Sequence, residues 1–284
     1  MKKLPIYIIC GPTATGKTAR SLELAREIGG EIISADSRQV YRDLNIGTAK
    51  ITKDEMDGIP HHMIDIVDPQ DYYSAALFKE ASERCINDIH KRGAIPIIVG
   101  GTGFYIDTLI YDQSLPLVPP QEHIRARYQD TPTEDLYKIL SHQDPVSSEK
   151  IDRHNRVRIV RALEIFETLG HIPQKPEKKL LYDIHWEYID RDNDDLKKRI
   201  HDRNITRVHG GLVDEVQGLL DQGISPERLH AFGLEYRYTL LYIQGLIKNK
   251  EELVTILDTK TWQFAKRQRT WFKKFLPQEV FRSL

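Results

Sequence analysis

A glycine loop near the start of the chain constrains its fold more than any other feature. Residues 11–18 read GPTATGKT and match the pattern G-x-x-x-x-G-K-[ST]. The apolar stretch 5–9 before the loop is typical of a strand, and residues 17–28 after it have apolar side chains at helical spacing. A strand, this loop and a helix in succession form a phosphate-binding unit, so we predict a P-loop.

Each part of the loop has a physical role in holding phosphate. Glycines let backbone amides wrap a phosphate chain, and the amino end of the helix adds partial positive charge. The Lys17 ammonium can neutralise terminal phosphate oxygens, and the Thr18 hydroxyl can complete a Mg²⁺ shell. The expected phosphate-binding residues are Gly11, Pro12, Thr13, Ala14, Thr15, Gly16, Lys17 and Thr18.

Strand and helix patterns alternate through the first 110 residues. Apolar Ile32-Ile33 precedes a polar turn, residues 62–67 favour a strand, 74–92 an amphipathic helix, and 94–99 a buried strand that enters Gly100-Gly101-Thr102-Gly103. Such alternation is typical of a parallel sheet with ligands at the carboxyl ends of its strands. We therefore predict an α/β fold with a doubly wound parallel sheet, like that of P-loop NTPases.

The composition changes near residue 112. Strand patterns disappear, Pro116, Pro119 and Pro120 interrupt the chain, and polar helical segments follow to about residue 200. We expect a catalytic core formed by residues 1–111 and about 200–284, with a helical insertion domain at about 112–199. The core is expected to end in a helix over 253–275.

Charge and cysteine content narrow the protein class. The chain has 41 Lys and Arg against 42 Asp and Glu, a net charge of −1, which excludes a wholly basic nucleic-acid coat but not a local basic face. No apolar run approaches 18 residues, so we expect no membrane span. Two isolated cysteines, Cys10 and Cys85, form neither a disulfide framework nor a zinc pattern, and we expect a cytoplasmic protein.

The loop alone leaves the ligand open. Many P-loop hydrolases carry a magnesium-organising Asp after the strand that here ends in Gly-Gly-Thr, and its absence argues against motors and switches. Asp36, after the second strand, is the acidic residue best placed to face the P-loop. A turn or helix-cap role for Asp36 is the alternative.

Several blocks together resemble the tRNA isopentenyltransferase (tRNA dimethylallyltransferase) family. The resemblance runs in order from residue 5 to about 275. Its blocks are GPTATGKT (11–18), DSRQVYRDLNIGTAK (36–50), HHMID (61–65), PIIVGGTGFYI (96–106), RIVRALEIFETLG (158–170), GLVDEV (211–216) and AKRQRTWF (265–272).

The resemblance implies a reaction. The family transfers a dimethylallyl group from dimethylallyl diphosphate to the exocyclic amine of the adenosine 3′ of the tRNA anticodon. Lys17, Thr18 and Mg²⁺ would stabilise the leaving diphosphate, while Asp36 would deprotonate the amine. Thr102 matches a family residue that contacts that amine, although a helix N-cap role is also open. The implied partners are dimethylallyl diphosphate and the tRNA anticodon stem-loop, with no membrane partner, and we expect a monomer.

The resemblance also implies RNA contacts, each with a structural alternative. Ser37, Arg38 and Gln39 would contact the anticodon loop together with Asp36 and Thr102, or form a solvated turn. Arg125 in the insertion would contact tRNA or lie on a solvated face. The family block in the insertion adds a further set of RNA contacts: Val160, Arg161, Ala162, Leu163 and Glu164.

Two segments carry local basic charge. Residues 150–161 hold five basic residues and one acid, and residues 266–274 hold five basic residues among aromatic ones. Phosphate contacts and base stacking need such a mixture, whereas core stripes with solvated charges would produce it too. Arg199 and Arg203, four apart on one expected helix, could reach the diphosphate, and we favour Arg203.

The chain departs from the family pattern in two places. Ile-Gly-Tyr-Lys-Glu appears here as residues 232–236, FGLEY, and Thr-Arg appears as Thr261-Trp262. Three other functions stay open on the residues alone: a small-metabolite kinase that consumes ATP, an RNA-binding module with a structural anion site, and prenylation of free adenine nucleotides.

Overall fold

The protein divides into two compact units in a computed structural model that describes residues 3–112, 115–174 and 178–281. The first unit comprises residues 1–111 and 180–284, and the second comprises 112–179. The second unit begins where the composition changes, but it ends twenty residues earlier than the expected boundary near 199. The reason is a strand in the intervening segment that pairs with the first unit.

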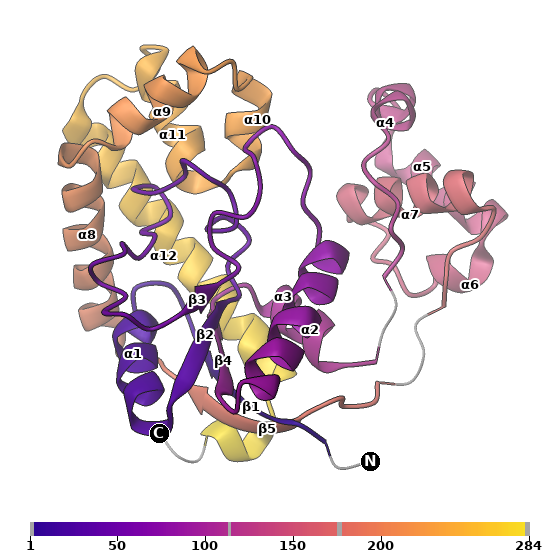
Figure 1. Cartoon of the computed structure of the whole chain (residues 1–284). Helices are drawn as coiled ribbons and strands as arrows, with labels where there is room; N and C mark the ends of the chain where they lie inside the picture. The colour runs from indigo at the N-terminus through magenta and orange to yellow at the C-terminus, as the bar shows by residue number, and fades with distance from the viewer. Residues whose placement is uncertain (1–2, 113–114, 175–177, 282–284) are drawn as a thin grey trace. The chain divides into compact units, whose positions relative to one another are not determined.

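A five-stranded parallel sheet forms the centre of the first unit, and the expected fold class is confirmed (Figure 1). The strand order is β3-β2-β4-β1-β5, and each neighbouring pair is parallel. The strands are β1 (Pro5–Cys10), β2 (Gly30–Ser34), β3 (His61–His62), β4 (Ile95–Gly100) and β5 (Asp183–Tyr188).

Two strand predictions need correction. Strand β5, which was not predicted from the sequence, pairs with β1 from Pro5 opposite Asp183 to Cys10 opposite Tyr188. The expected strand at 62–67 is reduced to β3, and beyond it only an isolated bridge joins Tyr41 to Val67. The chain there turns through positive φ at Met63 and Asp65, which breaks the extended pairing.

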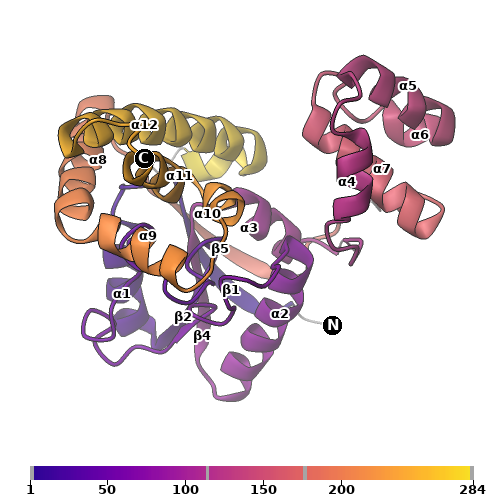
Figure 2. The ribbon, with the colours of Figure 1, turned by 90° about the horizontal axis from the view of Figure 1, so that it is seen from above.

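Helices on the two sides of the sheet complete the core (Figure 2). Helix α1 (Lys17–Ile28) packs Leu24 against Ile9 and Ile97 of the sheet, and Gly29 at φ 63° ends it in the left-handed conformation. Helix α2 (Ala75–Lys91) begins at Ser74, whose hydroxyl accepts from the Leu77 amide. The β1–α1–β2 unit therefore presents the phosphate loop at the carboxyl edge of the sheet.

Further helices of the first unit pack around that edge. Helix α3 (Gly103–Ile110) follows β4 and contacts α2 and α12, while α12 packs along α8. Figure 1 shows α9, α10 and α11 grouped beyond the strands. The bounds of these helices are α8 (Asn193–His209), α9 (Leu212–Asp221), α10 (Pro226–Ala231), α11 (Leu234–Ile243) and α12 (Lys250–Phe275), followed by a 3₁₀ turn at Gln278–Phe281.

The second unit is helical and has its own apolar core. Leu136, Leu140, Ile159 and Leu163 are fully buried in it. Its helices are α4 (Glu122–Tyr128), α5 (Thr133–Gln143), α6 (Pro145–Ser148) and α7 (Arg156–Leu169). In the part of the chain that the structure describes, no helix combines the length and apolar character that a membrane crossing requires.

Helix α12 approaches the turn after β4 so closely that Gly103 has no room for a side chain. A Cβ atom there would lie 2.2 Å from Cε3 of Trp271. Gly103→Ala is therefore expected to destabilise the protein by about 1–3 kcal/mol through overpacking. The measurement is urea unfolding followed by tryptophan fluorescence.

Gly218→Ala is the matched control, because Gly218 lies within α9 and a Cβ atom there meets nothing within 4 Å. The control should stabilise the protein by about 0.4–1 kcal/mol through reduced freedom of the unfolded chain. Equal effects of the two substitutions would contradict the close packing of α12 on this turn.

Candidate active site

A cavity of about 650 Å³ lies in the first unit at the carboxyl edge of the sheet. Segments that are distant in sequence meet there: the P-loop, the turn after β2, the glycine turn after β4, and parts of α8, α11 and α12. The site residues predicted in this unit that line it are Thr13, Ala14, Thr15, Gly16, Lys17, Thr18, Asp36, Ser37, Arg38, Gln39, Thr102 and Arg203.

The P-loop itself depends on glycine at its first position. Gly11 has φ 147°, and a Cβ atom there would lie 2.1 Å from the Ile189 carbonyl oxygen after β5. Lys17 Nζ donates to the Pro12 carbonyl at 2.6 Å, so the ammonium lies over the loop. Helix α1 starts at Lys17 without a capping side chain, which leaves the amides of its first turn directed toward an anion.

Three cations gather on one side of the cavity. Burial lowers the pKa of Lys17 from its ordinary 10.5 to about 8, and the nearby Arg203 guanidinium contributes. Burial also lowers the pKa of Arg203 to about 9, with Arg207 as the second cause. These shifts mean that the positive charges are poorly solvated and repel one another, so an anion bound between them is strongly favoured.

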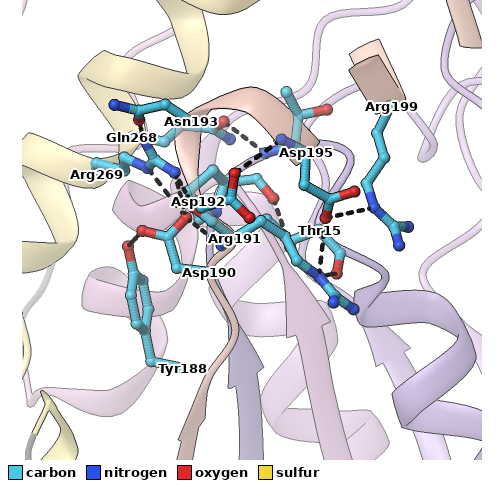
Figure 3. Close-up of polar contacts among 12 residues, drawn as sticks. Thr15, Tyr188, Asp190, Arg191, Asp192, Asn193, Asp195, Arg199, Gln268 and Arg269 are labelled. Carbon is cyan, nitrogen blue, oxygen red and sulfur yellow. Dashed lines mark hydrogen bonds and ion pairs between the residues drawn. The ribbon is translucent and has the colours of Figure 1, made fainter. Parts of the chain in front are cut away.

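Arg203 and Arg199 have different surroundings in the structure. Arg203 lines the cavity, whereas Arg199 Nε pairs with Asp195 Oδ2 at 2.9 Å (Figure 3). The preference for Arg203 as the residue that reaches the phosphate site agrees with this placement.

Asp36 is both a turn former and a cavity residue. Its Oδ1 accepts from the Arg38 amide at 2.8 Å and the Gln39 amide at 3.3 Å, as the turn interpretation requires. The carboxylate also lies near Lys17 and Arg203. Its negative charge opposes part of the lowering of their pKa values that burial causes. Asp36 and the P-loop therefore face one shared cavity.

Thr102 connects the turn after β4 to the Asp36 turn. It occupies the N-cap position of α3, but its hydroxyl makes no cap hydrogen bond there. Instead Thr102 Oγ1 accepts from the Ser37 amide at 3.2 Å, and the Thr102 amide donates to the Ala35 carbonyl at 3.3 Å. The hydroxyl thus bonds the residue that follows Asp36 and does not serve as a helix cap, and its contact with the amine stays a prediction.

Gln39 has an internal role. Its Oε1 accepts from Ser34 Oγ at 2.9 Å, and its Nε2 donates to the Thr48 and Ala49 carbonyls at 3.4 Å. The amide therefore ties the end of β2 to the 45–49 loop. Gln39 is partly exposed and lines the cavity, and its contact with RNA stays a prediction.

Three of the RNA contacts predicted in the second unit need correction, and those of Arg125, Val160 and Arg161 stay predictions. Ala162 and Leu163 lie in the apolar core at 4% and 0% exposure, and the Glu164 carboxylate is fully buried. Glu164 Oε1 accepts from Arg125 Nε at 2.6 Å, and its Oε2 from Arg161 Nη1 at 3.2 Å. Ala162, Leu163 and Glu164 therefore stabilise this unit, and Arg125 and Arg161 are held by that carboxylate. Val160, partly buried, packs against the same core.

The core interpretation of the basic segment 266–274 is confirmed, and its contact with RNA stays a prediction. On α12, Ala265, Gln268 and Phe272 are buried while the cations Lys266 and Arg267 between them are exposed. The helix is an ordinary amphipathic one whose exposed face is basic. Gln263, Lys266, Arg267, Thr270, Trp271 and Lys274 line a second hollow of about 560 Å³ along it.

Sequence reasoning missed several residues that line the cavity or support its wall. Arg207 pairs with Glu235 at 2.9 Å, and both line the wall. Glu215 accepts from the amides of residues 45–47 and from the Tyr236 hydroxyl at 2.8 Å. Gln268 joins two loops of the site. Glu235 and Tyr236 lie where the chain departs from the family pattern, and that departure could have drawn attention to them. Glu215 and Gln268 lie within the family blocks 211–216 and 265–272.

A first strand that leads through a phosphate loop into a helix, within a parallel sheet, defines this chain as a P-loop α/β protein. Its cavity is wider than a phosphate site and adds a carboxylate and a hydroxyl from two other strand ends. The family model described as IPP transferase matches residues 39–275, and the chain belongs to that family. The resemblance identified from the sequence blocks is thereby confirmed.

Relatives match over nearly the whole chain, including the P-loop that precedes the family model. A tRNA dimethylallyltransferase of Bacillus mycoides is 41% identical over 94% of this chain and 86% of its own length. One from Thermomicrobium roseum is 39% identical over 99% and 87%.

Solved structures agree. The tRNA Δ2-isopentenylpyrophosphate transferase of Staphylococcus epidermidis has a TM-score of 0.69 at 35% identity, covering 97% of this chain and 92% of that one. A eukaryotic dimethylallyltransferase acting on tRNA has a TM-score of 0.78 at 28% identity, covering 95% and 70%. The α/β fold with its P-loop is therefore shared across the family.

The lowered pKa of Lys17 predicts how anion binding depends on pH. Below about pH 8 the ammonium form predominates and attracts an anion, whereas above it the charge is lost. Affinity for inorganic diphosphate, divided by that of Lys17→Met, is expected to fall several-fold between about pH 7 and about pH 9.5. Isothermal titration calorimetry measures both affinities, and the ratio removes the titration of the ligand itself, which is the same with each protein. A constant ratio would contradict the assignment.

Proposed function

We propose that this chain transfers a dimethylallyl group from dimethylallyl diphosphate to the exocyclic amine of the adenosine 3′ of the anticodon in tRNA, with release of diphosphate. The names of its relatives support the reaction. The observation that carries the proposal is the shared cavity, in which the P-loop faces Asp36 and Thr102. One end suits a departing diphosphate and the other a nucleophilic amine.

The diphosphate end acts on the charge that develops as the allylic C–O bond breaks. Negative charge then accumulates on the leaving diphosphate, close to the P-loop amides, Lys17 and Arg203. Because these donors are held in place before the reaction, they stabilise the transition state without reorganising. Repulsion between Lys17 and Arg203 is relieved at the same time.

The residues present suit Mg²⁺ held mainly through the substrate. The Thr18 hydroxyl is exposed beside the P-loop, and Asp36 Oδ2 has no hydrogen bond while Oδ1 serves the turn. Among the described residues, no cluster of three or more His, Cys, Asp or Glu could hold a metal alone. Mg²⁺ commonly binds through one or two protein oxygens plus substrate phosphates. We propose Thr18 as a ligand; the bound ion would neutralise diphosphate charge.

At the amine end, Asp36 acts as the general base. The amine nitrogen forms a bond to the allylic carbon as the C–O bond to diphosphate breaks, and its proton passes to the Asp36 carboxylate. The Thr102 hydroxyl, fixed by the Ser37 amide, provides a second polar contact for the amine. The adenine must leave its stack in the anticodon loop to reach this position.

Exposed cations provide the RNA surface in this proposal. Lys266 and Arg267 lie on the exposed face of α12, and Arg267 also lines the reaction cavity. On the second unit, Arg153 and Arg158 are exposed at the start of α7. Phosphate contacts of this kind make affinity fall steeply with salt.

The Asp36→Asn substitution tests the role of Asp36 as a base separately from its role in the turn. The amide oxygen can still accept from the Arg38 and Gln39 amides, while the negative charge and the proton acceptor are lost. We expect prenyl transfer from labelled dimethylallyl diphosphate to tRNA to fall about 100-fold or more, with the melting temperature nearly unchanged.

Asp54→Asn is the matched control, since Asp54 is exposed and does not line the cavity. Near-normal turnover by Asp36→Asn would show that the base is assigned wrongly. The same assay tests the function: label only in AMP would indicate a nucleotide prenyltransferase, ATP consumption without prenyl transfer a kinase, and tRNA binding without turnover a binding module.

A further inference from the structure

The side chain of Gln268, on α12, joins the two glycine-rich loops of the cavity. Its Oε1 accepts from the Thr13 amide of the P-loop at 2.9 Å, and its Nε2 donates to the Gly101 carbonyl after β4 at 2.9 Å. We infer that Gln268 is a positioning residue that sets the separation between the diphosphate site and the amine site. This inference rests on the proposed function.

The amide has one orientation that satisfies both loops. The Thr13 backbone N–H can only donate and the Gly101 carbonyl can only accept, so Gln268 must present its oxygen to one and its nitrogen to the other. The residue is 7% exposed, so water cannot readily replace either partner. The bridge is therefore specific to an amide of this length.

The glycine turn is shaped to admit this side chain. A Cβ atom on Gly101 would lie 2.5 Å from Gln268 Nε2, and one on Gly103 would contact Trp271 of the same helix. Glycine at these positions lets α12 lie directly against the turn that leads to Thr102. The spacing of the turn from the helix is thus fixed on both sides of Thr102.

The next residue of α12 anchors the helix behind the P-loop (Figure 3). Arg269 Nη2 donates to Asp190 Oδ1 at 2.8 Å and Nη1 to Asn193 Oδ1 at 2.6 Å, both after β5. Arg191, from the same turn, donates through Nε to the Thr15 carbonyl at 3.3 Å. Helix α12 is therefore a fixed reference from which Gln268 can position both loops.

The two loops carry the two halves of the proposed reaction. The P-loop holds the departing diphosphate, and the Gly101 turn presents Thr102 beside Asp36. A change in their separation would misplace the allylic carbon relative to the amine, and misplacement of about 1 Å can lower a rate about 100-fold. Gln268 thus acts through its neighbours on the rate, with little effect on diphosphate binding.

Gln268→Ala and Gln268→Glu test this, with Gln222→Ala and Gln222→Glu as matched controls, since Gln222 is exposed after α9 and lines neither hollow. In single-turnover prenyl transfer to tRNA, both Gln268 variants are expected to lose about 100-fold at neutral pH. The affinity of Gln268→Ala for inorganic diphosphate should change less than about threefold. Unchanged rates, or losses of rate and diphosphate affinity in equal proportion, would overturn the inference.

The pH profile of Gln268→Glu is the distinguishing readout. A carboxylate would repel the Gly101 carbonyl, whereas the protonated acid has one O–H donor and one C=O acceptor, as the amide has. The rate of Gln268→Glu relative to wild type should therefore rise as the pH falls, and that of Gln268→Ala should not. A flat ratio for Gln268→Glu would count against the bridge.

Amide hydrogen exchange keeps the inference separate from the function. If the wild type transfers no prenyl group to tRNA, the proposed function fails, but exchange in residues 11–18 and 99–104 still tests the bridge. Faster exchange there in Gln268→Ala than in Gln222→Ala supports positioning by Gln268, and equal exchange overturns it.

Discussion

The close approach of backbone segments at the carboxyl edge of the sheet is the constraint on which the site depends. A Cβ atom on Gly11 would lie 2.1 Å from the Ile189 carbonyl, and one on Gly100 would lie 2.2 Å from the Ala35 carbonyl. Only glycine allows neighbouring strand ends to come this near. As a result the P-loop, the Asp36 turn and the Thr102 turn open into a single cavity, and hydrogen bonds between backbone and short side chains hold them there.

Charge then gives that cavity its chemical character. The residues that line it include five cations, Lys17, Arg38, Arg203, Arg207 and Arg267, but only two carboxylates, Asp36 and Glu235. The chain as a whole carries a net charge of −1, so the positive charge is concentrated where it is needed and balanced elsewhere. Burial and mutual repulsion of these cations raise the free energy of the pocket until an anion enters. The lowered pKa values of Lys17 and Arg203 have the same two causes.

Local sequence patterns predicted the parts of the fold that local interactions determine. Residues 17–28 form α1 as expected, because the glycine at each end and the apolar spacing all agree. Strand β5 was missed although Asp183, His185 and Glu187 alternate with its apolar residues, a pattern typical of a half-buried strand, because the polar segments around it favoured a helical insertion up to residue 199. Burial of Glu164 was equally hidden, since its arginine partner Arg125 lies 39 residues away. The diphosphate half of the site lies in one continuous motif and could be predicted from the sequence. Its contacts with α8, α11 and α12 join residues far apart in the chain and could not.

Two of the residues that depart from the family pattern, Glu235 and Tyr236, each bond a side chain from another helix. Glu235 stands where the family has Lys, and its partner Arg207 comes from α8, so the wall keeps a cation and gains a carboxylate bonded to it. Tyr236 stands where the family has Glu, and its hydroxyl donates to Glu215, which already holds the amides of Ile46 and Gly47. Tyr236 packs so near Gly47 that a Cβ atom there would lie 2.6 Å from its ring. Glu235 and Tyr236 thus each have a partner within the first unit, and the P-loop, Asp36 and Thr102 line the same cavity beside them.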